Sequence, residues 1–345
     1  MSVIQASSPH IHGPASVGRV MQQVSLALLP ALLAYTWLFG WGVAFNVVLA
    51  AASALLSEAA ILKLRGRPVA ATLADGSALL TALLLAIALP PLAPWWLIVV
   101  GTAFAIVFAK QLYGGLGFNP FNPAMVGYVV LLISFPLEMT SWLAPLALSE
   151  QSLSFSATAA FVFGGQLPAQ LGLDSLTMAT PLDTVKTRLG LEHTMGEILR
   201  APVFGNIGGH GWEIVNAMVL LGGIYLLLRR LITWHVPLAM LGTLFLVSGL
   251  FHLINPEHYS SPLFHIASGG ALLGAFFIAT DPVSGATSNR GRIVFAIGVG
   301  LFTFIIRAWG GYPDGVAFSI LLMNMAAPTI DYYTRPQVFG HKGGH

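Results

Sequence analysis

The chain has no cysteine and few charged residues. Of its 345 residues, 15 are Lys or Arg and 13 are Asp or Glu, so charged residues make up 8% of the chain. A soluble domain carries about 25%. The absence of cysteine excludes disulfides, thiolate zinc sites and cysteine-ligated iron–sulfur clusters from this chain. The net charge of +2 comes from scattered residues that form no basic stripe, which argues against nucleic-acid binding.

Apolar residues are correspondingly abundant and make up 56% of the chain. A folded soluble protein exposes a large exterior that needs polar cover, and this composition supplies too little of it. The sequence therefore predicts an all-α integral membrane protein.

Ten apolar stretches are candidates for membrane-spanning helices, each of which needs about 20 apolar residues. They are residues 20–39, 42–62, 76–90, 95–109, 122–135, 213–228, 235–253, 262–279, 293–308 and 314–328. The third, fifth and tenth are short for a full crossing, as in transporters whose membrane helices are broken. The residues before Arg19 hold no apolar signal segment, so we expect the first stretch to act as an uncleaved insertion signal.

The distribution of Lys and Arg predicts the orientation of these helices. With ten crossings, both chain ends lie on one side. That side collects 11 basic residues, namely Arg19, Lys63, Arg65, Arg67, Lys110, Arg229, Arg230, Arg290, Arg292, Arg335 and Lys342. The other side collects 4, namely Lys186, Arg188, Arg200 and Arg307. The prediction is a cytoplasmic N-terminal segment (1–19), a first five-helix half (20–135), an extracytoplasmic loop (136–211), a second five-helix half (212–328) and a cytoplasmic tail (329–345).

Two pairs of segments are similar to each other within the chain. GSALLTALLL at 76–85 is similar to GGALLGAFFI at 269–278, and KQLYGG at 110–115 is similar to RAWGG at 307–311. Chance similarity among Gly-, Ala- and Leu-rich helices is one explanation. The other is two inverted five-helix repeats with a site near the midplane between them.

Five ionisable residues fall inside or at the ends of the apolar stretches. Glu58 lies within the second stretch, and Lys110, Asp281, Arg307 and Asp314 lie at the ends of others. Charged groups at membrane depth are costly and mark candidate functional sites. The groups at the ends have a second interpretation, in which their side chains extend to the membrane surface.

Several shorter patterns bear on possible cofactors. His252 and His265, near the ends of adjacent stretches, offer a loose pair for haem. The segment GGLGFNPFNP at 114–123 lacks the spacing of a phosphate loop and predicts a break between two helices, with the amides of Asn119 and Asn122 satisfying freed backbone groups. The hydroxyl-rich segment 174–187 and the SGAT at 284–287 are each weak signals of a modification site when taken alone.

Longer segments together resemble the RnfD/NqrB family, and its RnfD members most closely. They are ASSPHIH near the start, KQLYGGLGFNPFNPAMVGYVVLLISFP at 110–136, ATPLDT at 179–184, TDPVSGATSNRGR at 280–292, and GGYPDGVAF and DYYTRP near the end. This family supplies membrane subunits of the Rnf ion-translocating ferredoxin:NAD oxidoreductase and of the sodium-pumping quinone reductase. The resemblance implies a ten-helix fold in a bacterial inner membrane.

The resemblance also implies a covalent FMN, joined through its phosphate to a threonine by a flavin transferase. The acceptor pattern, roughly D-x-x-[ST]-x-A-T, falls on Asp174, Thr177, Ala179 and Thr180, which makes Thr180 the implied acceptor. Met178 stands where such motifs often have glycine.

Two further expectations follow for the acceptor. Lys186 or Arg188 would offset the negative charge of the phosphodiester. Thr287 fits a loose form of the same pattern, but the charge distribution places it in the cytoplasm, whereas the transferase of this family works outside. Thr180 is therefore preferred to Thr287.

The resulting expectation is a subunit that relays electrons between ferredoxin and NAD through FMN, coupled to Na⁺ or H⁺ translocation. Partner subunits would carry iron–sulfur clusters, an NADH-site flavin and a second covalent FMN; riboflavin is an expected non-covalent cofactor without assigned residues. Candidates for ion coupling are Glu58, Lys110, Asp281 and Asp314. The alternative is an inverted-repeat transporter or channel without a redox role, in which the same charged residues would line a substrate path.

Overall fold

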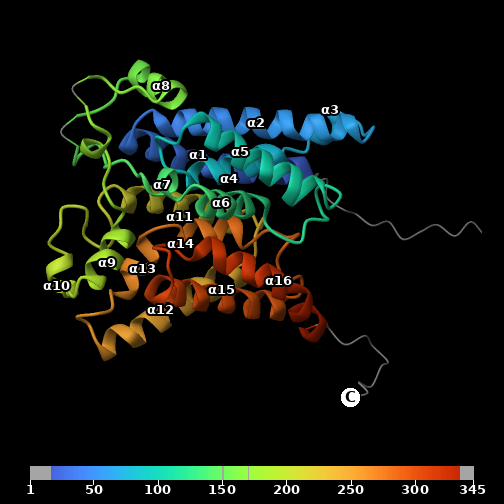
Figure 1. Ribbon diagram of the computed structural model, residues 1–345. Helices are drawn as coiled ribbons and strands as arrows, with labels where there is room; N and C mark the ends of the chain where they lie inside the picture. Colours follow the sequence, from blue (N-terminus) through green and yellow to red (C-terminus); the bar gives the residue numbers. More distant parts are fainter. Residues whose placement is uncertain (1–16, 150, 170, 335–345) are drawn as a thin grey trace, which may run out of the picture.

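The computed structural model describes residues 17–149, 151–169 and 171–334 and shows a bundle of helices (Figure 1). The described part contains no β-strand, only two isolated bridges. The first half of the bundle consists of α1 (Val17–Phe39), α2 (Gly42–Leu64), α3 (Val69–Leu73), α4 (Ser77–Ala88), α5 (Trp95–Phe104), the π-helix η1 (Ala105–Gln111) and α6 (Pro123–Ser134). The second half consists of α11 (Trp212–Leu228), α12 (His235–Ile254), α13 (Pro262–Ala267), α14 (Ala271–Leu273), the π-helix η3 (Gly274–Ile278), α15 (Asn289–Trp309) and α16 (Val316–Thr334).

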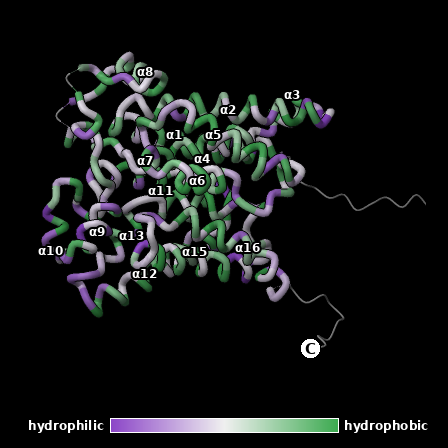
Figure 2. Tube along the Cα trace, in the orientation of Figure 1, coloured by the Kyte–Doolittle hydropathy of each residue, from purple (hydrophilic) through white to green (hydrophobic). Residues whose placement is uncertain are grey.

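Four helices, α1, α2, α12 and α15, are long and apolar enough to cross a membrane. Helices α1 and α2 have 23 residues each, which corresponds to about 34 Å, against about 30 Å of hydrocarbon. Hydrophobic residues follow the central helices, and hydrophilic ones gather toward both ends of the bundle (Figure 2). The structure is that of a multi-pass membrane protein. Helices occupy all ten predicted ranges. That the chain crosses the membrane ten times stays a prediction.

The segment between the two halves forms its own group of short helices. It holds α7 (Pro136–Thr140), α8 (Phe155–Gly164), the 3₁₀ turn η2 (Leu173–Ser175), α9 (Pro181–Gly190) and α10 (Met195–Ile198). These helices lie at one end of the bundle, and the start of α1 and the end of α16 lie at the other (Figure 1). That 136–211 lies on the other side of the membrane from the chain ends stays a prediction. Arg335 and Lys342, two of the basic residues expected on the cytoplasmic side, lie outside the described residues.

Two predicted ranges differ from the structure. The tenth predicted helix is not short, because α16 runs over 19 residues to Thr334. The eighth is not continuous, because α13 ends at Ala267 and helical structure resumes at Ala271. Gly269 has φ +65° in this break. This backbone conformation ends a helix, and residues other than glycine rarely adopt it. The third and fifth helices, α4 and α6, have 12 residues each, as short as expected.

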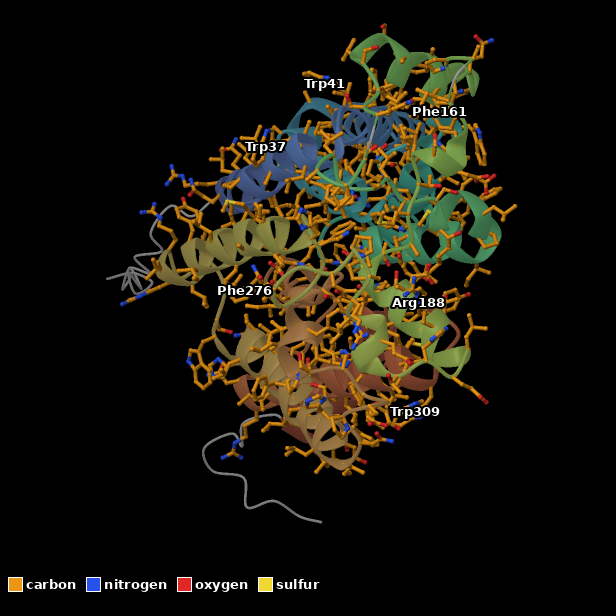
Figure 3. All side chains as sticks on the ribbon, turned by 90° about the vertical axis from the view of Figure 1, so that its left-hand side faces the viewer. Trp37, Trp41, Phe161, Arg188, Phe276 and Trp309 are labelled. Carbon is orange, nitrogen blue, oxygen red and sulfur yellow. The ribbon has the colours of Figure 1, made fainter. Side chains whose placement is uncertain are left out.

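The two halves meet along α1 and α11 and along α6 and α16. Gly222 of α11 lies in this interface, where a Cβ atom would lie 2.1 Å from the Ala27 carbonyl oxygen of α1. Within the second half, Phe276 of η3 is buried against the neighbouring Gly223 (Figure 3). Small residues at such crossings allow helices in membranes to approach closely.

The internally similar segments have similar local structure. Gly76 before α4 has φ +74° and Gly269 before α14 has φ +65°. The next amide binds a carboxylate in each case: the Ser77 N–H donates to Asp75 at 2.7 Å, and the Gly270 N–H donates to Asp314 at 2.6 Å. This match is local, and the full inverted repeat stays a prediction.

Candidate functional site

Thr180 is the N-cap residue of α9, at the end of the bundle away from the start of α1 and the end of α16. Its Oγ1 accepts the N–H of Asp183 at 3.3 Å, which is the usual contact of a capping threonine. Pro181 follows at the first helical position, where its missing N–H costs nothing. The sequence A-T-P-L-D therefore starts a helix at Thr180 and leaves the hydroxyl at the helix N-terminus.

The chain before and after Thr180 is held firmly. The backbone of Met178 donates to the Trp142 carbonyl at 2.9 Å. Pro181 fills the space over Gly209, where a Cβ would lie 2.1 Å from the proline ring. Leu182 lies over Gly269, where a Cβ would lie 2.5 Å from the leucine methyl. The first turn of α9 thus packs directly against two glycines, which leave room for its side chains.

Thr180 borders a cavity of about 160 Å³ between the two halves. Aromatic side chains supply much of its wall, namely Tyr128, Trp142, Trp212 and Tyr312. Trp142 and Trp212 contact each other with ring centroids 5.4 Å apart. Asn216, Gly269, Gly270 and Asp314 add polar groups to the wall. The cavity is an apolar space with a few polar groups, the usual composition of a small-molecule site. The aromatic walls could not be foreseen from the sequence, because the four residues are widely separated in the chain.

The other residues of the acceptor pattern differ in their contacts and exposure. Thr177 Oγ1 donates to the Leu173 carbonyl at 3.1 Å and so stabilises the turn before the acceptor. Asp174 and Ala179 are exposed. Arg188 is also exposed, on the face of α9 that points out of the bundle (Figure 3). No contact ties Arg188 to Thr180, and its part in offsetting a phosphodiester stays a prediction.

Lys186 makes a contact that the sequence did not suggest. Its Nζ donates to the carbonyl oxygens of Ile306, Arg307 and Tyr312 at 3.3–3.5 Å, which joins α9 to the C-terminal end of α15. Partial burial lowers the pKa of Lys186, and nearby Asp183 acts in the opposite direction. Burial likewise raises the pKa of Asp183, with Lys186 opposing it. The predicted role of Lys186 beside a phosphodiester is additional to this contact and stays a prediction.

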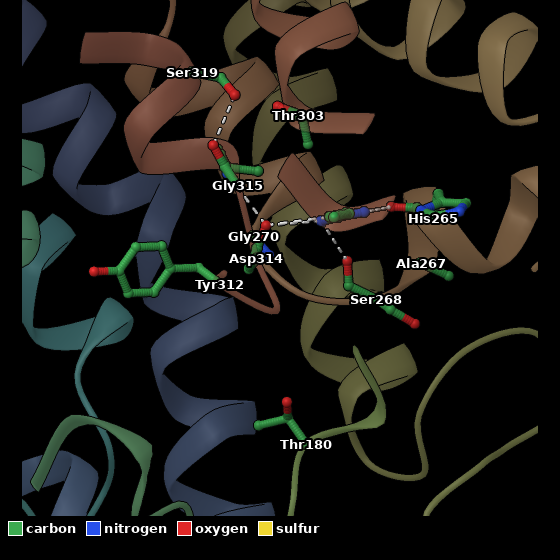
Figure 4. Close-up of polar contacts among 12 residues, drawn as sticks. Thr180, His265, Ala267, Ser268, Gly270, Thr303, Tyr312, Asp314, Gly315 and Ser319 are labelled. Atoms are coloured by element: carbon green, nitrogen blue, oxygen red, sulfur yellow. Dashed lines mark hydrogen bonds and ion pairs between the residues drawn. The ribbon is translucent and has the colours of Figure 1, made fainter. Parts of the chain in front are cut away.

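Arg307, next to this contact, binds the backbone at the break between α13 and α14, and Figure 4 shows His265, Ser268 and Gly270 at this break. Its guanidinium donates to the carbonyls of His265 at 2.5 Å and Ser268 at 3.2 Å. It also pairs with Asp314 at 3.0 Å, and Asp314 in turn accepts the Gly270 N–H. The side chain of Arg307 is 2% exposed, so the alternative in which it extends to the membrane surface is wrong.

Glu58 and Lys110 form a second buried pair, toward the end of the bundle that holds the start of α1 and the end of α16. Lys110 Nζ lies 2.6 Å from Glu58 Oε1 and 2.7 Å from Ser77 Oγ. Gln111 Nε2 donates to the same Glu58 oxygen at 2.6 Å. The π-helical turn η1 brings Lys110 and Gln111 to this position by widening the end of α5. Lys110 is 2% exposed and Glu58 is fully buried, so Lys110 does not extend to the membrane surface either.

Asp281 lies near Lys110 across a second cavity. This space of about 190 Å³ is bordered by Ser77, Lys110, Asn119 and Asp281. Asp281 accepts the N–H of Val283 at 3.0 Å and the hydroxyl of Ser284 at 2.8 Å. The four ion-coupling candidates therefore separate: Glu58, Lys110 and Asp281 lie toward the start of α1 and the end of α16, and Asp314 borders the cavity of Thr180.

The weaker patterns also have defined positions. Asn122 caps α6 by accepting the Met125 N–H at 3.2 Å, and Asn119 donates to the Phe121 carbonyl at 2.9 Å, which confirms the expected helix break. Thr287 donates to Asp331 near the end of α16, at the opposite end of the bundle from Thr180.

The two histidines considered for haem make separate hydrogen bonds. His252 Nδ1 contacts the Tyr259 carbonyl at 2.7 Å, and His265 Nε2 contacts the Ser260 hydroxyl at 3.0 Å. No three His, Asp or Glu side chains gather for a metal within the part of the chain that the structure describes.

The fold and the site together define a class: a helical, multi-pass membrane protein with one cavity at each end of the interface between its halves. The model of the NQR2, RnfD, RnfE family matches residues 4–340, and the chain belongs to that family.

Relatives of known name match along their whole length. The chain is 53% identical to the RnfD subunit of the ion-translocating oxidoreductase complex of Aliivibrio salmonicida over 353 residues, which cover all of both proteins. It is 52% identical to the protein of the same name from Klebsiella pneumoniae, over 98% of this chain and 99% of the relative. The protein of that name from Shigella dysenteriae is 51% identical over the same shares.

Proposed function

We propose that this chain is a membrane subunit of an Rnf-type complex, which relays electrons between ferredoxin and NAD and couples the transfer to Na⁺ or H⁺ translocation. In the proposal, FMN is attached through its phosphate to Thr180. The observation that carries it is the position of the Thr180 hydroxyl, at a helix N-terminus and on the edge of an aromatic cavity. The names of relatives more than 50% identical over the whole chain support the assignment to a complex.

The residues around Thr180 fit a phosphate ester. The N-terminus of α9 favours negative charge through the helix dipole and its unpaired N–H groups. In the described structure the hydroxyl accepts one hydrogen bond and donates none, so replacing its proton by a phosphoryl group breaks no protein contact. The Asp183 N–H stays directed at the same oxygen.

The lining of the cavity supports the proposal that it holds the flavin ring. Tyr128, Trp142, Trp212 and Tyr312 offer flat apolar faces, and the Asn216 side chain lines the same space. FMN would supply one- and two-electron transfer there, and the protein supplies position and electrostatics. Asp314 and Arg307 hold the floor of the cavity by fixing Gly270.

The proposed ion coupling rests on the buried pair of Glu58 and Lys110. Glu58 Oε2 and Gln111 Oε1 are buried and accept no hydrogen bond from the described residues. Buried acceptor oxygens without donors are suited to a cation or a proton. If Glu58→Gln left both electron transfer and ion uptake by membrane vesicles at wild-type levels, this part of the proposal would fall.

The chain needs partners for the rest of the electron path. It has no cysteine to hold an iron–sulfur cluster. The proposed partners are subunits with iron–sulfur clusters, an NADH-site flavin and a second covalent FMN, and a flavin transferase matures Thr180. A non-covalent riboflavin belongs to the proposal without assigned residues. The proposed location is the bacterial inner membrane with both termini in the cytoplasm.

Peptide mass spectrometry tests the attachment. The subunit is purified under denaturing conditions from cells that also make the transferase, and an FMN adduct is expected on the peptide with Thr180. Thr180→Asn removes the hydroxyl but keeps a good N-cap, so it should abolish the adduct without loosening α9. Thr187→Asn makes the same change at an exposed position of α9 and should keep the adduct.

Other results would redirect the assignment. An adduct on Thr287 would mean that flavin is attached at the opposite end of the bundle. No flavin on any peptide, with an active transferase, would favour the transporter without a redox role.

A further inference from the structure

Lys186 lies outside the Thr180 cavity but contacts Tyr312, one of the residues that line it. It lies on α9, about 9 Å along the helix axis from Thr180. Its Nζ donates to the carbonyls of Ile306 and Arg307 in the last turn of α15 and to that of Tyr312 beyond it. Tyr312 itself borders the cavity, together with Asp314 and Val316. One ammonium group thus joins the helix of Thr180 to the segment from Tyr312 to Val316, which also borders the cavity.

The contact is electrostatically favourable and specific to a cation. The C-terminal carbonyls of a helix carry partial negative charge, and Lys186 meets them at the end of α15. Arg188, two residues on, carries the same charge on the exposed face of α9 and makes no such contact. The two residues therefore form a natural pair of test and control within one helix.

The rest of the docking of α9 is apolar and depends on shape. Leu182 and Val185 are buried with Met195, Ile198 and Phe264 in a small cluster of their own. Five apolar side chains bury little area compared with the main core, so a single polar contact has a large share in fixing this helix. Asp183 lies between Thr180 and Lys186 in the chain, and its backbone N–H donates to Thr180 Oγ1.

We propose that Lys186 is a positioning residue that fixes the cofactor-bearing helix α9 on the end of α15 and so holds Thr180 in place relative to the cavity residues Tyr312 and Asp314. The significance of the cavity rests on the proposed function, whereas the contact of Lys186 is independent of it. Replacing the cation frees both α9 and the segment 310–316. Because one side chain joins the two, they loosen together.

Hydrogen exchange of the intact complex, read by mass spectrometry on peptides of this chain, tests the proposal. Lys186→Gln should raise exchange in 183–190 and in 310–316 by about tenfold. Lys186→Arg keeps a cation of similar reach and should restore most of the protection. Arg188→Gln, which removes the same charge nearby, should leave both segments as in the wild type.

The FMN adduct on Thr180 is measured in the same preparations. The adduct should remain in Lys186→Gln, since Thr180 keeps its backbone contacts, and the reduction of that flavin in a single turnover should slow. Unchanged exchange in Lys186→Gln would overturn the inference. So would equal effects of Lys186→Gln and Arg188→Gln, a failure of arginine to restore protection, or loosening of α9 alone. A wild-type chain without any adduct would instead overturn the proposed function, and the exchange data would still decide the role of Lys186.

Discussion

The two buried cations, Lys110 in the first half and Arg307 in the second, balance their charge in different ways. Lys110 relies on side chains, pairing with Glu58 of α2 and Ser77 of α4. Arg307 relies on two backbone carbonyls in a helix break and on Asp314, seven residues away in the chain.

The difference follows from the chemistry of the two cations. An ammonium is a compact charge that a single carboxylate neutralises, whereas a guanidinium carries several donors in one plane and joins several acceptors. The first site is thus a direct ion pair between side chains of two helical segments. At the second site, the Arg307 guanidinium stabilises the irregular backbone between α13 and α14 by donating to its carbonyls. Where irregular backbone lies at membrane depth, its carbonyls must find donors within the protein.

The largest expected effect comes from breaking the two pairs. Lys110→Met leaves Glu58 buried and unpaired and should cost about 3–5 kcal/mol of folding free energy. The double variant Lys110→Met, Glu58→Leu should recover most of the loss, because no buried charge remains. Arg307→Met with Asp314→Leu should not recover, because the carbonyls of His265 and Ser268 lose their donor. Thermal unfolding in detergent measures these variants, and equal recovery in both halves would show that the two sites do not differ.

A smaller difference in stability is expected between alanine variants of the two glycines that precede the short helices α4 and α14. Gly76→Ala and Gly269→Ala both place a side chain at positive φ, a strain of about 1–3 kcal/mol. At Gly76 the new Cβ would meet only Met21 at 3.5 Å, an ordinary contact. At Gly269 it would meet Asp314 at 2.4 Å and Leu182 at 2.5 Å. Gly269→Ala should therefore destabilise more and also raise exchange in α9; equal losses of stability would argue against a tight seat for Leu182.

The smallest effect should come from the serines beside the two cations. Ser77 accepts a hydrogen bond from Lys110 and donates to Asp75, so Ser77→Ala should cost about 1–3 kcal/mol. Ser268 Oγ is buried and has no hydrogen-bond partner among the described residues, so Ser268→Ala should be neutral or slightly stabilising. A clear loss in Ser268→Ala, seen in the same unfolding assay, would mean that its hydroxyl has a function beyond packing.

Much of the fold could be predicted from composition and pattern alone. Long apolar stretches give helices because backbone groups in lipid must bond within their own segment, and helices occupy all ten predicted ranges. The break between α13 and α14 escaped prediction, because SGGALLG is apolar enough to pass for a continuous span. Its causes are Gly269 and the distant guanidinium of Arg307, and the second of these is not local in the sequence.

The candidate site shows the same division. Thr180 could be selected from the motif and from the family resemblance, and the Pro181 that follows predicts the helix start where the structure has it. Glu58 and Lys110 could each be selected as charged residues in apolar surroundings. Their pairing could not, because they are 52 residues apart and meet only through the widened turn of η1.

The sequence by itself determined that the chain is a helical membrane protein, which residues are costly to bury, and the family to which it belongs. These follow from local properties: hydropathy, charge and motif. Only the tertiary structure decided which charges neutralise each other, where the helix breaks, which aromatic residues enclose the space beside Thr180, and that Lys186 joins α9 to α15. The physical reason is that pairing and enclosure depend on distances between remote segments, which the packing of helices sets.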